Sequence, residues 1–134
     1  DNTYSNNHPM FGTVSEWYYR WLAGIQPDPD HPGFKEFFIT PTIPERLESV
    51  NCTYISPHGA IVSNWRKTSE GYSYDISIPN GTKANITLPV SQSQIVIISN
   101  KQGQNLSNRV VGLQTGQFYL QEGDYVITVT SKNE

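Results

Sequence analysis

Two carboxylates and an imidazole lie within four residues of the chain, in the segment Pro27-Asp28-Pro29-Asp30-His31-Pro32-Gly33. Oxygen and imidazole donors at this spacing could hold a hard cation. The three prolines, however, keep the segment extended and turn-like, so a rigid connector from a helix to a strand explains the same residues. We favour the connector and predict no metal and no cofactor.

A second candidate is His8, which lies in the segment Ser5-Asn6-Asn7-His8-Pro9-Met10-Phe11-Gly12, just ahead of a predicted helix. A loop imidazole can donate a hydrogen bond to a sugar hydroxyl, and loops commonly carry such binding groups. Taken alone, a histidine in a loop is more typical of ordinary surface. Its assignment as a sugar contact therefore depends on the resemblance described below.

Catalytic groups are harder to find. Glycoside hydrolysis normally needs one acid and one base or nucleophile, and the carboxylates of this chain occupy a helix cap, turns and the polar faces of strands. No Gly-x-Ser-x-Gly motif is present, and Cys52 lies in a predicted strand, where a buried structural thiol is expected. We therefore assign no catalytic residue. The acidic positions considered are Glu16, Glu36, Glu48, Glu70, Asp75, Glu122 and Asp124.

The first third of the chain contains one amphipathic helix, predicted over Thr13 to Ala23. Thr13 and Glu16 have the spacing of a capping box, and Gly24 stands where a left-handed C-cap would be. A stripe with two tryptophans must be buried, either on the rest of the chain or against a partner outside it. Its apolar residues recur at helical spacing: Val14, Trp17, Tyr18, Trp21, Leu22 and Ile25.

After residue 33 the apolar period changes to two, which is typical of strands, and turn residues separate the runs. This pattern predicts a mainly β fold, an antiparallel sandwich of Greek-key or jelly-roll type, preceded by the one helix. The predicted strands are Phe34–Thr40, Val50–Ser56, Ala60–Lys67, Tyr72–Ile78, Ala84–Leu88, Gln94–Ile98, Val110–Gly112, Phe118–Leu120 and Asp124–Thr130.

Composition excludes several classes of partner. The 134 residues carry a net charge of −3 with no basic stripe, which argues against nucleic acid. No apolar run approaches the roughly 20 residues of a membrane-spanning helix, and the first residues do not resemble a signal peptide. Four Asn-x-Ser/Thr sequons occur, of which Asn51 and Asn85 fall inside predicted strands, so chance occurrence is favoured over glycosylation.

A family resemblance appears in the same residues. The run Ser5-x-Asn7-His8-x-Met10-Phe11-Gly12, with Glu16-Trp17 and Ala23-Gly24-Ile25 after it, is similar to the end of the catalytic domain in bacterial α-L-rhamnosidases of glycoside hydrolase family 78 type. The resemblance is dense over residues 5–89. It continues through His31-Pro32-Gly33-Phe34-Lys35, Tyr54-x-Ser56-Pro57-x-Gly59, Ser63-x-Trp65 and Ile78-Pro79-x-x-Thr82.

The resemblance implies a parent enzyme that removes terminal α-L-rhamnose with inversion, through two glutamates in an upstream (α/α)6 barrel. It implies that residues 1–33 end that barrel, that residues 34–134 form the following β-sandwich, and that His8 contacts the rhamnose. The expected partners are a rhamnose-containing glycan and the barrel in cis, and a periplasmic or secreted parent is favoured. Because no stretch resembles the acid or base segments, the chain alone is expected to be inactive.

Two other functions fit a β-sandwich. A free-standing carbohydrate-binding module would need aromatic side chains on a flat exposed face, and its candidates Trp65, Tyr72 and Tyr74 are interpreted as core residues because of their alternation. An adhesion domain of immunoglobulin type is the other alternative, since a sandwich alone does not specify function. The helix stripe favours the rhamnosidase, because neither alternative needs such a helix.

Overall fold

The structure is a computed structural model that describes residues 7–9, for which only the backbone is considered, and residues 20–132. Within these residues the chain is mainly β, as predicted, and the strands form one hydrogen-bonded sheet. The strands are β1 (Asn7–Pro9), β2 (Ile25–Pro27), β3 (Glu36–Ile39), β4 (Ser49–Ser56), β5 (Gly59–Lys67), β6 (Gly71–Thr87), β7 (Gln94–Asn100) and β8 (Gln117–Ser131). The 3-10 turns are η2 (Pro32–Phe34), η3 (Ser107–Arg109) and η4 (Leu113–Thr115).

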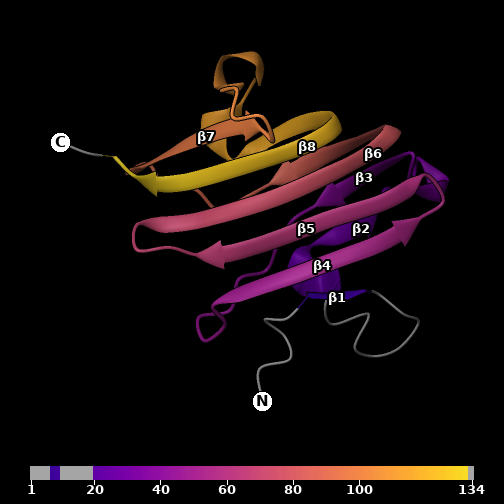
Figure 1. Cartoon of the computed structure of the whole chain (residues 1–134), viewed down its shortest axis with the longest axis horizontal. Helices are drawn as coiled ribbons and strands as arrows, with labels where there is room; N and C mark the ends of the chain where they lie inside the picture. The colour runs from indigo at the N-terminus through magenta and orange to yellow at the C-terminus, as the bar shows by residue number, and fades with distance from the viewer. Residues whose placement is uncertain (1–6, 10–19, 133–134) are drawn as a thin grey trace.

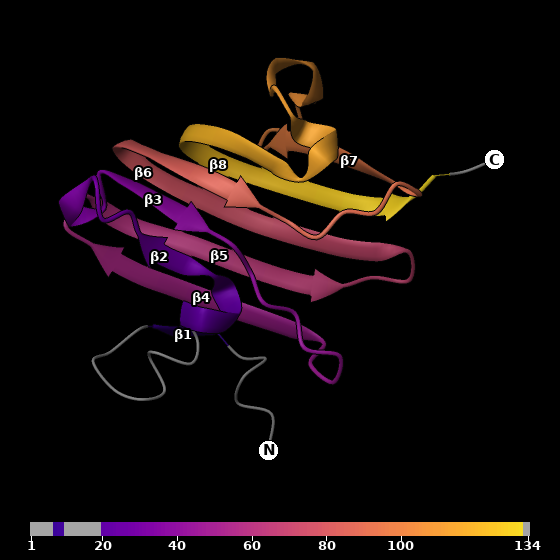
Figure 2. The same ribbon diagram turned by 180° about the vertical axis from the view of Figure 1, so that it is seen from behind.

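The sheet folds over into two layers because two long strands pass through both. The first half of β6 pairs with β5, its second half pairs with β3, and β8 pairs with both halves. The first layer therefore runs β1-β4-β5-β6-β8-β7 (Figure 1), and the second contains β2, β3 and the other halves of β6 and β8 (Figure 2). Except for the parallel pairs β1–β4 and β3–β6, the described pairings are antiparallel.

A corner in β6 and β8 makes the second layer possible. The register between them shifts between Ile78 and Lys83, where Gly81 has a φ of 77° and its N–H donates to a Glu122 carboxylate oxygen at 2.7 Å. Across the corner, the Tyr125 hydroxyl donates to the Gln121 carbonyl at 2.9 Å. The sequence predicts turns at both places. The segments before and after each turn are predicted as separate strands. In the structure they are the two halves of one bent strand, β6 or β8.

Side chains alternate between the space between the layers and the outer faces, as the sequence pattern predicts for Tyr74, Ile76 and Ile78. The largest fully buried side chains come from both layers and from the helix end. They are Trp65, Tyr74, Phe37, Phe118, Leu22, Ile25, Ile39, Ile61, Ile76, Ile86, Ile98 and Ile127.

Two details of the strand prediction are wrong. Val110–Gly112 is not a strand but part of the link between η3 and η4, and Gly112 has a φ of 82°, a left-handed conformation that ends extended pairing. Phe34 belongs to η2 rather than to the following strand, and it also has a positive φ, of 62°. A short apolar run does not by itself distinguish a strand from a turn.

Of the predicted helix, residues 20–23 are described and helical, whereas residues 13–19, including Thr13 and Glu16, lie outside the described residues. Gly24 ends the helix with a φ of 79°, and its N–H donates to the Arg20 carbonyl at 2.7 Å. The predicted glycine C-cap is therefore confirmed. No helix in residues 20–132 is long and apolar enough to cross a membrane.

No further named strand pairs with the other edge of β7 in the described residues; side chains and the backbone of residues 104–106 cover it. The Val96 N–H donates to the Gln114 side-chain oxygen at 2.9 Å, and the Gln114 amide nitrogen donates to the Val96 carbonyl at 2.7 Å. Two residues further along β7, the Ile98 N–H donates to the Ser107 hydroxyl at 3.0 Å. A glutamine amide thus replaces a neighbouring strand, which protects an edge that would otherwise invite pairing with another chain.

We predict that Gln114→Ala lowers the free energy of unfolding by about 1–2 kcal/mol, because both Val96 backbone groups lose a partner. It should also increase self-association, measured by light scattering, since the β7 edge is opened. Gln102→Ala, in an exposed loop, is the matched control. Equal urea midpoints and equal scattering for the two variants would show that the Gln114 amide does not protect the edge.

Candidate functional site

His8, the predicted sugar contact, lies in β1, where its backbone is opposite Cys52 of β4 in a parallel pairing. Its side chain is outside the part of the chain whose side chains are described, so its role stays a prediction. What the structure adds is a fixed neighbour for its backbone. β1 is held against the edge of the first layer rather than in an isolated loop.

The helix end is bound to the inner side of β5 by two buried hydrogen bonds. The Ser63 hydroxyl donates to the Ala23 carbonyl at 2.8 Å, and the Trp65 indole N–H donates to the Leu22 carbonyl at 3.1 Å. The last carbonyls of a helix have no partner within the helix and must be satisfied elsewhere when buried. Here the sheet supplies the donors. Of the described residues of the helix stripe, Leu22 and Ile25 are therefore packed on the sheet and almost fully buried, whereas Trp21 is exposed.

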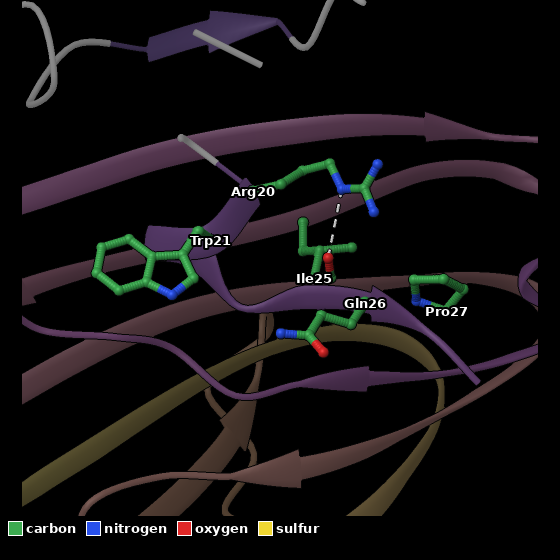
Figure 3. A pocket seen from close by; sticks show the side chains of 5 residues that line it. All are labelled: Arg20, Trp21, Ile25, Gln26 and Pro27. Carbon is green, nitrogen blue, oxygen red and sulfur yellow. Dashed lines mark hydrogen bonds between the residues drawn. The ribbon is translucent and has the colours of Figure 1, made fainter. Parts of the chain in front are cut away.

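Beside this contact is a surface hollow of about 340 Å³ lined by Arg20, Trp21, Ile25, Gln26 and Pro27 (Figure 3). The Arg20 Nε donates to the Ile25 carbonyl at 3.4 Å, on the outer edge of β2. The Arg20 guanidinium also lies 4.8 Å from the centre of the Tyr54 ring, a cation–π contact. Arg20 thus links the helix end, β2 and β4, while Trp21 remains 40% exposed.

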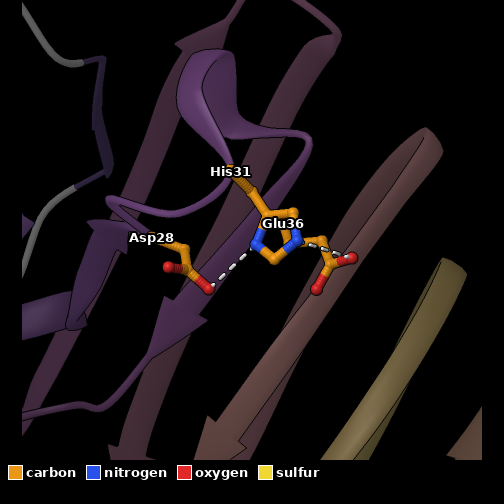
Figure 4. A group of neighbouring side chains, drawn as sticks. All are labelled: Asp28, His31 and Glu36. Carbon is orange, nitrogen blue, oxygen red and sulfur yellow. Dashed lines mark hydrogen bonds and ion pairs between the residues drawn. The ribbon is translucent and has the colours of Figure 1, made fainter.

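Three side chains cluster at the proline-rich connector. The sequence suggests Asp28, Asp30 and His31, but in the structure Glu36 rather than Asp30 is the second acid beside His31. His31 Nδ1 is 3.2 Å from an Asp28 carboxylate oxygen and His31 Nε2 is 3.6 Å from a Glu36 oxygen (Figure 4), whereas the Asp30 backbone N–H donates to Asp28. Glu36 joins because η2 folds the chain back onto β3.

The geometry of this cluster suits a clamp better than a metal site. The candidate ligand atoms of Asp28, His31 and Glu36 lie within 4.8 Å of one another. However, the two carboxylates lie at opposite nitrogens of the ring, as Figure 4 shows, and a cation bound to one nitrogen would face only one of them. The hydrogen bond between His31 and Asp28 within the connector and the contact of His31 with Glu36 of β3 account for the arrangement.

The three aromatic candidates for a carbohydrate-binding module lie in the core or pack against it. Trp65 and Tyr74 are each 1% exposed, and Tyr72 packs partly buried beside them. Burial is the main reason that the pKa of the Tyr74 hydroxyl is raised well above its ordinary value, with the neighbouring Tyr72 adding to the shift. The Trp65 and Tyr74 rings are unavailable to a ligand, so their interpretation as core residues is confirmed, whereas Tyr72 is only partly buried.

Comparison with known proteins now decides the family. A family model described as the bacterial alpha-L-rhamnosidase C-terminal domain matches residues 24–103. The chain belongs to this family. A protein named alpha-L-rhamnosidase from Formosa agariphila is 31% identical over 127 residues, which cover 93% of this chain and 13% of that protein. Another of that name from Streptomyces avermitilis is 33% identical over 85 residues, covering 63% of this chain and 8% of its own length.

Solved structures of α-L-rhamnosidases share the fold of this C-terminal domain. The structure from Dictyoglumus thermophilum has a TM-score of 0.66 at 18% identity. The match covers 90% of this chain and 14% of the Dictyoglumus thermophilum chain. The Streptomyces avermitilis structure, complexed with L-rhamnose, has a TM-score of 0.61 at 22% identity. That match covers 85% of this chain and 10% of the Streptomyces avermitilis chain. The chain thus spans only about an eighth of the Formosa relative, and the resemblance seen in the sequence is confirmed at the level of the family.

We predict that Ser63→Ala lowers the free energy of unfolding by about 1–3 kcal/mol, since the buried Ala23 carbonyl loses its donor. Hydrogen exchange at Gly24 should accelerate together with this loss, because the helix end is released from β5. Ser77→Ala, a half-buried serine of β6 on the outer face, is the control. A Ser63→Ala variant as stable as Ser77→Ala, with unchanged exchange at Gly24, would contradict the docking role.

Proposed function

We propose that this chain is the C-terminal part of an α-L-rhamnosidase that hydrolyses terminal α-L-rhamnose from glycosides or polysaccharides with inversion. The acid and the base of that reaction belong to an upstream (α/α)6 barrel in the same polypeptide. Membership of the rhamnosidase C-terminal domain family supports this proposal, as does the small share of each relative that the chain covers.

In this proposal residues 1–33 are the end of the barrel domain and residues 34–134 are the β domain that follows. The observation that carries it is the pair of buried hydrogen bonds from Ser63 and Trp65 to the last helix carbonyls. A β domain that satisfies those carbonyls fixes the end of the helix. Its role is therefore structural: it holds the last helix of the barrel in place.

His8 is the one residue of the chain to which we assign a contact with substrate, a hydrogen bond from its imidazole to the rhamnose. The assignment follows from the motif around it and from its position ahead of the predicted helix. Parallel pairing of its backbone with Cys52 supports a defined position rather than a free loop.

We predict that the 134-residue chain alone does not hydrolyse an aryl α-L-rhamnoside, because the proposal assigns the acid that protonates the leaving oxygen and the base that activates water to the upstream barrel. The measurement is release of the aryl alcohol against a buffer blank. Turnover that follows the protein through repeated purification would place catalytic groups within this chain and refute the proposed division of labour.

We predict that His8→Ala in the complete enzyme lowers kcat/KM by about 1–3 kcal/mol, which is roughly 5- to 150-fold, the range for losing a hydrogen bond to a polar partner. Thermal stability should barely change, since the backbone pairing with β4 needs no imidazole. His58→Ala, in the turn between β4 and β5, is the control. A variant that melts several degrees lower but retains wild-type kinetics would make His8 structural.

A further inference from the structure

A polar hollow of about 160 Å³ lies on the outer face of the first layer, where β4, β5 and β6 run side by side (Figure 1). The neighbouring Trp65 and Tyr74 direct their rings to the interior, so the hollow is on the face of the sheet opposite the core. Each of the three strands contributes two polar side chains to its lining. They are Ser49 and Asn51 of β4, Asn64 and Arg66 of β5, and Ser73 and Asp75 of β6.

Strand pairing brings the lining side chains together. Arg66 is opposite Ser73, and Asn64 is opposite Asp75. On the other side of β5, the register with β4 is the same before and after this point, so Asn51 is opposite Asn64. Side chains directly opposite each other in an antiparallel pair have β-carbons about 4.5–5.5 Å apart, and diagonal neighbours are within reach of long side chains. The polar groups therefore surround one small space.

Asp75 and Arg66 bring opposite charges to the hollow from adjacent strands. They are diagonal neighbours in the β5–β6 register. Even so, no described residue forms an ion pair or a hydrogen bond with either side chain. The half-buried Asp75 carboxylate therefore offers acceptors, and the exposed Arg66 guanidinium offers donors, to a ligand in the hollow.

Ser73 is the most buried of the polar lining residues. It is only 7% exposed, and no described residue forms a hydrogen bond with its hydroxyl. Alternation along β6 places its side chain on the side of the hollow, because Tyr74 points to the core. A hydroxyl buried to this extent normally has a hydrogen-bond partner. A ligand seated in the hollow would be within reach to supply one.

The Asn64 amide is held in one orientation by β4. The Cys52 N–H donates to the Asn64 side-chain oxygen at 2.9 Å. A side-chain amide accepts through its oxygen and donates through its nitrogen, so the nitrogen is the group that Asn64 offers to a ligand. The hollow thus presents nitrogen donors from Asn64 and Arg66 and a hydroxyl from Ser73 beside the carboxylate of Asp75.

This mixture of groups selects the chemistry of the ligand. An anion would be repelled by Asp75 and a cation by Arg66. A sugar hydroxyl both donates and accepts, so neighbouring hydroxyls of one ring can bind to both kinds of group. Pockets that hold drug-sized ligands have volumes of roughly 300–1,000 Å³. A hollow of about 160 Å³ is suited to a single sugar ring.

From these observations we propose that the hollow is a binding subsite for one neutral sugar residue of a glycan. Asp75 accepts hydrogen bonds from the sugar hydroxyls, Arg66 donates to them, and the Ser73 hydroxyl gains a partner. Recognition depends on hydrogen bonds rather than on stacking, because the Trp65 and Tyr74 rings are buried. The β domain then binds glycan itself, which goes beyond the structural role proposed above and does not depend on it.

The experiment is an amide NMR titration of the 134-residue chain with L-rhamnose, D-galactose and D-glucose as neutral probes. Inorganic phosphate and Ca²⁺ test whether the hollow takes an anion or a cation instead. Asp75→Asn and Ser73→Ala each remove a polar group of the hollow. Their matched controls are Asp124→Asn, an exposed acid of β8, and Ser77→Ala, a serine of β6 on the same face.

We expect at least one neutral sugar to give saturable shifts at the amides around the hollow, and phosphate and Ca²⁺ to give none there. The dissociation constant should rise about tenfold in Asp75→Asn, which loses a charged acceptor, and about fivefold in Ser73→Ala. The two controls should bind as wild type. Urea midpoints of the hollow variants should match those of their controls, because neither side chain has a described partner to lose.

Absence of saturable shifts with all three sugars overturns the proposal. Binding that Asp75→Asn and Ser73→Ala leave unchanged overturns it as well, because the sugar would then bind elsewhere. Shifts at the same amides with phosphate or Ca²⁺ would assign the hollow to an ion, with the same consequence. The titration does not involve hydrolysis, so the proposed function is tested separately from this inference.

Discussion

The hydrogen bonds that β5 donates to the last carbonyls of the helix are the interaction on which the rest of the structure depends. A helix ends with carbonyl groups that lack partners, and burying them unsatisfied costs about 1–3 kcal/mol each. Ser63 and Trp65 are two residues apart in one strand, so both side chains point to the interior, where the Ala23 and Leu22 carbonyls lie. The helix can therefore end inside the protein rather than at its surface.

The chain reversal after the helix follows from this docking. Gly24 adopts a positive φ, and its backbone is so close to Thr40 and Pro41 that a β-carbon there would collide with their backbone atoms. β2 can then pair with β3 and close the second layer, and the connector returns through the clamp of Asp28, His31 and Glu36. The helix end and the strands that follow it thus form one packed unit.

Sequence reasoning recovered those parts of the fold that have a periodic signal. Alternation located β4, β5 and both halves of β6 and β8, and Gly24 marked the helix end. β1 and β2 were missed because three residues, one of them a proline, carry no period and depend on a partner strand for their structure. Contacts made by single side chains between elements were also invisible, among them Gln114 on Val96, Asn64 on Cys52 and Glu36 beside His31. The family was recognisable from local motifs, whereas the role of His8 remains a prediction, since a backbone register does not reveal what an imidazole contacts.

Exchange of the Trp65 indole N–H in the 134-residue chain, followed by NMR in deuterated water, tests most directly whether the β domain holds the helix end. The account predicts protection comparable to that of the amides in the centre of β6, because the indole N–H is buried and donates to the Leu22 carbonyl. Exchange of the indole proton at the rate of a solvent-exposed tryptophan, while the amides of β6 stay protected, would show that the helix end is not docked and would contradict the structural role assigned to this domain.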